Sequence, residues 1–342
     1  MGKNIYLSHT KLQCTYLLPS PHHNNFHSNT GHSYQLRALD FDTTGPFKDF
    51  PQLTVYHPSE GHAYAQIGWP GNVGVLSGFS DQQLAISEIG VSLVVRVVVV
   101  LYLYYGIVRF GCTLIIVFRE LCVNPFVATA PQTLFESLFS ISPLSTQVTY
   151  PDDSFGQGTD NTPPEKVHGE PWMFILRDVL QFEDSLQGAE DRIANANRTC
   201  NLIIGVGDGE ENMVNGIEFS GYVAIPYDDV TLLPVNDTWH PKIDDVVYNG
   251  MDWLCPGYTG PLGDQLQKYH GSISEVNTIQ NILPTVQTGD LHAVVYDLTE
   301  QLMHVSFCRR GSADPSEPHY AYERQFTRLN MKDIFAQQAP VV

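Results

Sequence analysis

The sequence has few basic residues for its length. Of its 342 residues, 18 are Lys or Arg and 37 are Asp or Glu, so the formal net charge is −19. A surface this acidic repels phosphate backbones, and we therefore expect no nucleic-acid partner. The same charge disfavours docking on a membrane of anionic lipids.

The six cysteines have no recognisable metal-binding spacing. No CxxC pair occurs, and no Cys/His cluster has the spacing of zinc ligands. The sequence therefore predicts no metal and no cofactor.

A recognisable signal peptide is also absent. Residues 1–20 lack a basic stretch followed by an apolar one. Two Asn-x-Thr triplets, at Asn197 and Asn236, are acceptor sites for N-glycans and would suit a secreted or lysosomal protein. Because such triplets occur often by chance, they do not decide the compartment.

A long apolar block at residues 93–149 stands apart from the rest of the chain. Within 93–118 the longest run without a charge is twelve residues, Val97 to Val108, whereas a membrane-spanning helix needs about 20. Arg96 and Arg109 would lie in the hydrocarbon. Three interpretations stay open: a membrane-spanning helix, a buried pair of strands, or a segment foreign to the domain, such as translated non-coding sequence.

The remaining residues predict an α+β layered domain. Short β-rich segments separated by Gly, Pro and Ser turns indicate antiparallel strands, and helical periodicity follows them. GVGDG at 205–209 resembles part of a phosphate loop, but no helix follows it, so we predict a hairpin turn. The predicted strands are 33–40, 52–57, 62–67, 73–77, 83–89, 200–206, 215–223, 291–298 and 302–308. The predicted helices run from Pro171 to Gly188, over 189–196, 242–255 and 261–270, and over 275–283 with Ser274 as cap and Pro284 as end.

Two charged residues interrupt a β-rich run, RALDFD at 37–42. Arg37 and Asp40 stand among apolar neighbours, and buried charges need partners. From these residues alone two roles stay open: an Arg–Asp ion pair that only joins strands, or a functional site.

Seven segments, taken in order, resemble one protein family. They are YQLRALDFD (34–42), TVYHP (54–58), GWPGNVGVLSG (68–78), LAISE (84–88), WMFILRD (172–178), NRTCNLIIG (197–205) and GDLHAVVYD (289–297). Together they resemble the cysteine N-terminal-nucleophile (Ntn) hydrolases related to penicillin acyltransferase, peptidase family C45. Acid ceramidase and bile-salt hydrolase are more distant relatives of that family.

The resemblance implies an Ntn-hydrolase αββα sandwich interrupted by the apolar block. It covers about 34–92 and 150–335, so we expect 33–92 and 150–335 to form one domain. Residues 1–32 would be an atypical leader, 93–149 an insertion foreign to the domain, and 336–342 a tail. If the insertion is foreign, Ser92 and Tyr150 should be neighbours.

The resemblance also implies a chemistry. Its members cleave or transfer a linear amide bond of a small N-acyl substrate. The nucleophile is a cysteine freed by self-cleavage of the peptide bond before it, and its own α-amine serves as the base. A thioester forms, and water or an amine acceptor resolves it.

Four site residues follow from matching the family motifs. Arg37 and Asp40 match an R-x-x-D motif, in which the arginine steadies the nucleophile region and the aspartate holds the α-amine. Glu88 matches an acidic residue near the cleavage and substrate site. Asn236 is the candidate for the oxyanion-hole asparagine, on approximate spacing.

The nucleophile departs from the family pattern. Counting back about nineteen residues from Asp40, as in the family, leads to Pro21 rather than to a cysteine. Cys14 is the only upstream cysteine, and using it requires a longer first hairpin. The alternatives are a serine nucleophile at Ser20, an inactive or truncated member acting as a binding protein, or a protein tethered to a membrane through 93–118.

Overall fold

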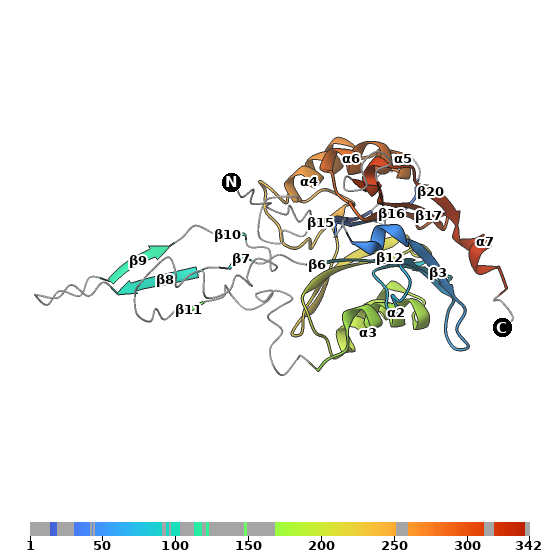
Figure 1. Cartoon of the computed structure of the whole chain (residues 1–342), viewed down its shortest axis with the longest axis horizontal. Helices are drawn as coiled ribbons and strands as arrows, with labels where there is room; N and C mark the ends of the chain where they lie inside the picture. The colour runs from blue at the N-terminus through green and yellow to red at the C-terminus, as the bar shows by residue number, and fades with distance from the viewer. Residues whose placement is uncertain are drawn as a thin grey trace, which may run out of the picture.

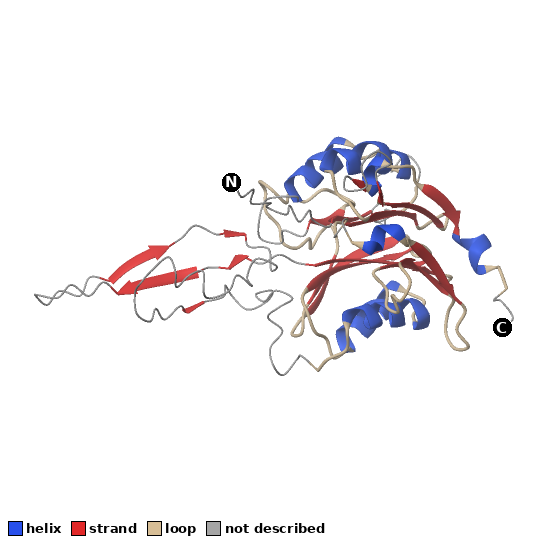
Figure 2. Ribbon diagram, in the orientation of Figure 1, coloured by secondary structure: helices blue, strands red, loops and turns tan. Residues whose placement is uncertain are grey.

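Two antiparallel sheets lie face to face between two layers of helices (Figures 1 and 2). The structure is a computed structural model. It describes residues 14–18, 31–90 except 42 and 44, 168–250, 259–310 and 318–338, with short strands between 94 and 148. The predicted αββα sandwich is confirmed.

The upper sheet has six strands in the order β15-β1-β2-β16-β17-β20. The predicted strands 33–40, 291–298 and 302–308 are confirmed here as β2, β16 and β17. The N-terminal stretch predicted as a leader contributes β1, which pairs with β2 on one side and β15 on the other. The strands are β1 (Cys14–Leu18), β2 (Tyr34–Leu39), β15 (Val247–Gly250), β16 (His292–Asp297), β17 (Leu302–Phe307) and β20 (Thr327–Asn330).

The lower sheet has seven strands in the order β14-β13-β12-β6-β5-β4-β3. The predicted strand 73–77 is wrong, because the N–H of Val75 donates to the carbonyl of Met173 instead of to a neighbouring strand. A hairpin turn does join β12 and β13, but it lies at 209–212 and not at 205–209, because residues 205–208 pair with β13 as the end of β12. The strands are β3 (Gln52–Tyr56), β4 (Tyr64–Gly68), β5 (Ser77–Ser80), β6 (Leu84–Gly90), β12 (Leu202–Asp208), β13 (Met213–Phe219) and β14 (Ala224–Tyr227).

Helices α2 (Trp172–Phe182) and α3 (Leu186–Asn195) cover the outer face of the lower sheet (Figure 2). Ile175, Val179 and Ile193 pack there in one buried cluster with the strand residues. The predicted break at Gly188 is wrong. Ser185 begins α3 because its side chain accepts the N–H of Gly188, a cap that satisfies one unpaired donor of the first turn.

The other outer face is covered by α4 (Thr259–Lys268) and by a helix in three parts. These parts are α5 (Glu275–Asn277), the π-helical η5 (Thr278–Ile282) and α6 (Leu283–Val286). The Ser274 cap is confirmed, since its hydroxyl accepts the N–H of Asn277. Pro284 does not end the helix, because it lies in the first turn of α6, where a missing N–H is tolerated.

The predicted helix 242–255 is wrong over its described part. Val247–Gly250 is β15, which pairs antiparallel with β1. The run Val246-Val247-Tyr248 is β-branched and aromatic, and pairing with β1 outweighs its helical spacing. Shorter elements complete the described part: η1 (Pro46–Asp49), β18 (Arg309–Arg310), β19 (Pro318–His319), η6 (Ala321–Glu323) and α7 (Met331–Phe335).

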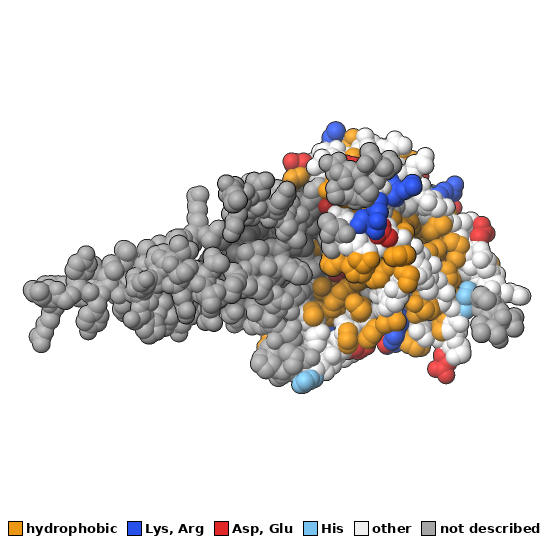
Figure 3. All heavy atoms as spheres, viewed as in Figure 1, with side chains coloured by type: hydrophobic (Ala, Val, Ile, Leu, Met, Phe, Trp, Pro, Cys, Tyr) orange, Lys and Arg blue, Asp and Glu red, His pale blue; other side chains and the backbone are white. Residues whose placement is uncertain are grey.

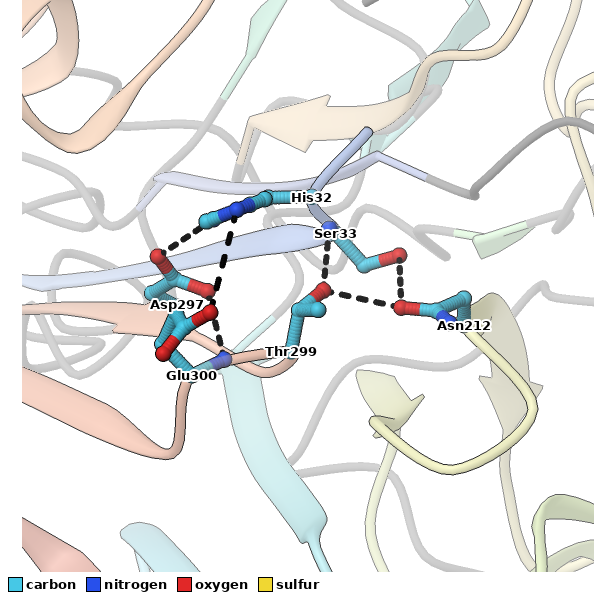
Figure 4. A network of polar contacts seen from close by, with 6 residues as sticks. All are labelled: His32, Ser33, Asn212, Asp297, Thr299 and Glu300. Atoms are coloured by element: carbon cyan, nitrogen blue, oxygen red, sulfur yellow. Dashed lines mark hydrogen bonds and ion pairs between the residues drawn. The ribbon is translucent and has the colours of Figure 1, made fainter. Parts of the chain in front are cut away.

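A polar network joins the two sheets at the end where β2 begins (Figure 4). The hydroxyl of Thr299 accepts the N–H of Ser33 at 3.0 Å and donates to Oδ1 of Asn212 at 2.8 Å. Asn212 belongs to the β12–β13 turn of the lower sheet, whereas Thr299 follows β16 of the upper one. His32 lies 2.9 Å from a carboxylate oxygen of Asp297 in the same network. This end of the sandwich is therefore closed by side-chain hydrogen bonds.

The apolar block contributes short strands that form two small sheets of their own. β8 (Val97–Tyr102) pairs with β9 (Thr113–Val117) and β11 (Gln147–Val148), and β7 (Val94–Val95) pairs with β10 (Leu121–Cys122). Ser92, Tyr150 and half of the residues 93–118 of the predicted membrane span lie outside the described residues. Over the part of the chain that is described, no helix has the length and apolarity to cross a membrane.

Candidate active site

The opposite end of the sandwich brings Cys14 and Asp40 together. The register sets Cys14, the first residue of β1, opposite Ala38 of β2 and Gly250 of β15. Asp40 directly follows β2. Because β1 and β2 are antiparallel, the start of β1 and the end of β2 lie at one edge of the sheet. Two of the predicted site residues are thus neighbours in the fold.

Asp40 is a buried carboxylate held by a tight turn. Its Oδ1 accepts the N–H groups of Gly289 and Asp290, both at 2.7 Å, and its Oδ2 accepts the hydroxyl of Thr288 at 2.7 Å. Gly289 has φ of +87°, a left-handed conformation that lets consecutive N–H groups converge on one anion.

Opposing effects set the pKa of Asp40. Burial first, and then the charge of Asp290, raise the pKa of Asp40 to about 7, while the three hydrogen bonds oppose the shift. An ordinary α-amine has a pKa only slightly above this value. At neutral pH, Asp40 is therefore able to pair with an α-ammonium group beside it.

Arg37 and Glu88 form a buried ion pair between the sheets. Nη2 of Arg37 donates to Oε1 of Glu88 at 2.7 Å, and both side chains are almost fully buried. Burial raises the pKa of Glu88, and Arg37 opposes that shift. Among the described residues, the ion-pair partner of Arg37 is thus Glu88 and not Asp40, which removes the Arg–Asp strand pair left open above.

The second contact of Arg37 is with the backbone beside Cys14. Its Nη1 donates at 2.5 Å to the carbonyl of Ala38, the residue opposite Cys14 in the sheet. The guanidinium therefore fixes the strand at the point where the predicted nucleophile pairs.

Asn236 lies in a local turn. Its Oδ1 accepts the N–H groups of Thr238 and Trp239, and its backbone pairs with His240. Among the described residues, this side chain makes only these local hydrogen bonds, so the structure does not join Asn236 to the other predicted site residues. Its role as oxyanion donor stays a prediction.

Asn249 is better placed for that role, and sequence reasoning missed it. It lies opposite Thr15 in the sheet, one position from Cys14, and is 3% exposed. The carbonyl of Leu233 only accepts, so the amide atom 2.9 Å away is Nδ2, and the hydroxyl of Tyr227 then donates to Oδ1 at 2.7 Å. The second N–H of Nδ2 is the group that this arrangement can offer to a ligand.

Tyr227 reaches Asn249 because Gly216 leaves room for its ring. A Cβ at Gly216 would lie 2.4 Å from ring atoms of Tyr227. The predicted helix over 242–255 concealed Asn249, since a helical assignment hides which residues face β1. The signal that could have found it is the β-rich run just before it.

A second buried contact links the sheets nearby. Nε2 of His292 lies 3.0 Å from the hydroxyl of Ser77, and both residues are fully buried. Burial, and next the charge of Arg37, lower the pKa of His292 well below its ordinary value. The imidazole is therefore neutral, so His292 supplies no general acid to the candidate site.

Aromatic rings lead away from Asp40 along the next residues. The ring of Phe41 lies 5.6 Å from that of Phe47, which lies 4.5 Å from that of Trp69. Phe41 is 45% exposed. Figure 3 shows apolar side chains gathered on one face of the molecule. We call Phe41, Phe47 and Trp69 the aromatic strip.

The described residues hold no group of three or more His, Cys, Asp or Glu that could bind a metal ion. Cys308 is a free, buried thiol. Burial chiefly raises the pKa of Cys308 to about 11, so this thiol is a poor nucleophile at neutral pH.

No protein-family model matches the chain. Two curated relatives come from Dictyostelium discoideum. Protein dcd1A is 27% identical over 319 residues, covering 89% of this chain and 56% of the relative. Protein dcd1B is 28% identical over 321 residues, covering 90% and 50%. The chain thus spans about half the length of the curated relatives it matches.

Similar solved structures include three hydrolases and acylases. The Caenorhabditis elegans ortholog of N-acylethanolamine-hydrolysing acid amidase has a TM-score of 0.45 at 13% identity, covering 92% of this chain and 99% of its own. A variant of conjugated bile acid hydrolase from Clostridium perfringens has 0.46 at 10%, covering 93% of each chain. Penicillin V acylase from Agrobacterium tumefaciens has 0.38 at 9%, covering 86% and 82%.

Proposed function

We propose that this chain cleaves or transfers the linear amide bond of a small N-acyl substrate, with Cys14 as nucleophile. The observation that carries the proposal is the sheet register, which sets Cys14 opposite Ala38 and beside the end of β2 where Asp40 follows. The register sets Asn249 one position from Cys14, Asp40 two residues beyond its partner Ala38, and the Ala38 carbonyl under the Arg37 guanidinium. These are the parts that an N-terminal thiol nucleophile needs.

Activation frees the α-amine of Cys14. The thiol attacks the carbonyl of Gln13, the Gln13–Cys14 peptide bond breaks, and the acyl group moves to sulfur as a thioester. Water then hydrolyses the thioester, releasing the Gln13 carboxylate and restoring the thiol. Asp40 holds the new α-ammonium, and Arg37 keeps β2 in place through the carbonyl of Ala38.

Turnover uses the same groups. The α-amine accepts the thiol proton as sulfur attacks the substrate carbonyl, and the oxyanion takes a hydrogen bond from Nδ2 of Asn249. The C–N bond then breaks, the amine leaves with the proton, and an acyl-thioester remains. Water or an acceptor amine resolves it, which separates hydrolysis from transfer.

The aromatic strip gives the acyl group a place to lie. Phe41 directly follows Asp40, and Phe47 and Trp69 extend the apolar surface from there. We infer that the acyl half of the substrate is apolar, since burying apolar area against these rings supplies binding energy.

Intact-mass measurement of the purified chain tests the proposal. The wild type should yield a fragment that starts at Cys14, and Cys14→Ala should remain uncut. Cys200→Ala is the matched control, because Cys200 lies just before β12 and outside the strands that pair with β1, so this variant should process normally. Processed protein should also release amine from N-acyl amides and react with iodoacetamide at Cys14.

Two results would overturn the proposal. One is a wild type that is never cut before Cys14. The other is a Cys14→Ala variant that hydrolyses N-acyl amides as fast as the wild type. A chain that binds N-acyl amides but neither processes nor labels would instead be a binding protein.

A further inference from the structure

Glu218 is a buried carboxylate that none of the steps above uses. It lies in β13, it is 3% exposed, and its Oε1 has no hydrogen-bond partner among the described residues. Burial alone raises the pKa of Glu218 to about 7. Ionised carboxylates are seldom left without a partner in a protein interior, because an unpaired buried charge costs several kcal/mol.

The side chain faces the space between the two sheets. Successive residues of a strand point to opposite faces, so Val214, Gly216 and Glu218 share one face of β13. Val214 packs in the core between the sheets, and Gly216 lies under the ring of Tyr227. This face of β13 is therefore turned toward the upper sheet. The residues of opposite parity, Ile217 and Phe219, pack against the helices instead. Glu218 therefore points inward, on the side from which Tyr227 reaches Asn249.

Glu218 is close enough to Tyr227 to affect its ionisation. Burial first, and then the charge of Glu218, raise the pKa of Tyr227 well above its ordinary value. Tyr227 in turn donates to Asn249, which lies one position from Cys14 in the sheet register. The carboxylate is thus a near neighbour of the candidate active site and not a remote surface charge.

Glu218 lies next to the edge strand of the lower sheet. Its cross-strand partner in β14 is Ile225, which is 38% exposed, and Tyr222 in the turn before β14 is 52% exposed. Exposed apolar side chains thus lie at the sheet edge beside the buried carboxylate. The net charge of −19 favours cations over anions near the molecule.

We propose that Glu218 binds an ammonium group in the amine half of the substrate. The site would then prefer N-acyl amides whose amine part carries a positive charge over those that carry a carboxylate. The inference that Glu218 belongs to a substrate site rests on the proposed function. The binding of an alkylammonium at Glu218 is testable without any turnover.

A matched substrate series tests the preference. N-octanoyl-1,4-diaminobutane, N-octanoyl-4-aminobutanol and N-octanoyl-4-aminobutyrate differ only in the charge at the end of the amine part. The wild type should show kcat/KM at least about tenfold higher for the cationic than for the anionic member, since losing a buried charge partner costs that much or more. In Glu218→Gln the preference should fall to within about threefold. An unchanged preference overturns the proposal.

Ligand-induced thermal stabilisation separates this inference from the proposed function. At pH 8, n-octylammonium should raise the Tm of the wild type, whereas octanoate and 1-octanol should raise it much less. Glu218→Gln should lose the ammonium effect. Glu190→Gln is the control: it removes one carboxylate that bonds Asn215 on the outer face of the same strand, and it should keep the effect.

The two measurements distinguish failure of the proposed function from failure of the cation site. If no N-acyl amide is hydrolysed but octylammonium stabilises the wild type and not Glu218→Gln, the proposed function fails and the cation site stands. If octylammonium stabilises both proteins equally, the cation site fails whatever the activity.

A pH titration of wild-type protein keeps the inference testable if Glu218→Gln fails to fold. The ammonium stays charged between pH 5 and 8.5, so its stabilisation should grow as Glu218 ionises near pH 7. Among the described residues, the other titratable groups on these strands include Tyr227, which stays protonated, the Arg37–Glu88 pair, and Asp208 at the far end of β12. A flat profile overturns the proposal.

Discussion

Nη2 of Arg37 lies 2.7 Å from Oε1 of Glu88, so one ion pair spans the two sheets beside the start of β1. Arg37→Met should therefore leave an unpaired buried carboxylate and reduce the free energy of unfolding by about 3–5 kcal/mol in urea titrations. The double variant Arg37→Met/Glu88→Leu should recover most of that loss, because it removes both charges. A double variant no more stable than the single one would show that the loss does not come from the unpaired charge.

Asp40→Asn should keep the fold and slow self-cleavage and turnover. An asparagine carbonyl can still accept the N–H groups of Gly289 and Asp290, but it cannot pair with an α-ammonium. With its pKa raised to about 7, wild-type Asp40 is protonated at lower pH, so kcat/KM should rise with pH through about 7. The rise of kcat/KM with pH through about 7 should be absent from the residual activity of Asp40→Asn. A profile identical in both proteins would remove Asp40 from the mechanism.

Tyr227→Phe should lower kcat more than it changes KM. The ring still fits over Gly216, but Oδ1 of Asn249 loses its donor and the amide is no longer held in one orientation. Asn249→Ala should cost more, about 10²–10³ in kcat, if its Nδ2 donates to the oxyanion. Asn236→Ala is the matched comparison, and the asparagine whose loss lowers kcat is the oxyanion donor.

The fold was largely predictable because its strands and helices carry clear local patterns. β2, β16 and β17 show runs rich in buried apolar residues, and Ser274 caps its helix through the usual side-chain hydrogen bond. Errors arose where a tertiary contact decides the structure. Met173 takes the N–H of Val75, and β1 recruits residues 247–250 into a sheet. No local signal reports either partner.

The candidate site residues also fall into those that a sequence motif indicates and those that only tertiary contacts reveal. Arg37, Asp40 and Glu88 were predicted as site residues from motif resemblance, and the structure shows their contacts: Arg37 pairs with Glu88, while Asp40 is held by the 288–290 turn. Asn249 and Glu218 were missed, because each becomes distinctive only when the two sheets are stacked. Glu218 in particular looks like any polar residue of a half-exposed strand until its burial is known.

Glu218→Gln should stabilise the protein at high pH only. Because the folded-state pKa is raised from 4.5 to about 7, the contribution of Glu218 to stability is intact below about pH 4.5 and is lost as pH rises through 7. The variant should therefore match the wild type near pH 4.5 and exceed it by about 2–3 kcal/mol at pH 8. Denaturant titrations at both pH values check this, and equal stability at pH 8 would mean that Glu218 already has a partner.

Trp69→Ala should raise KM for long acyl chains and leave kcat nearly unchanged. The indole supplies apolar area at one end of the aromatic strip, and losing it weakens ground state and transition state alike. The effect should grow from acetyl to octanoyl amides of one amine. The same KM ratio for both chain lengths would place the acyl group elsewhere.

The end of the sandwich opposite the His32–Asn212 network is also where the chain enters β1 and leaves β6 and β15, at Cys14, Gly90 and Gly250. In the sequence, the apolar block begins three residues after Gly90. The hydrogen bonds of the His32–Asn212 network involve none of these three strand ends. Insertions beyond the three strand ends can therefore accumulate in the sequence while the network keeps the two sheets in register.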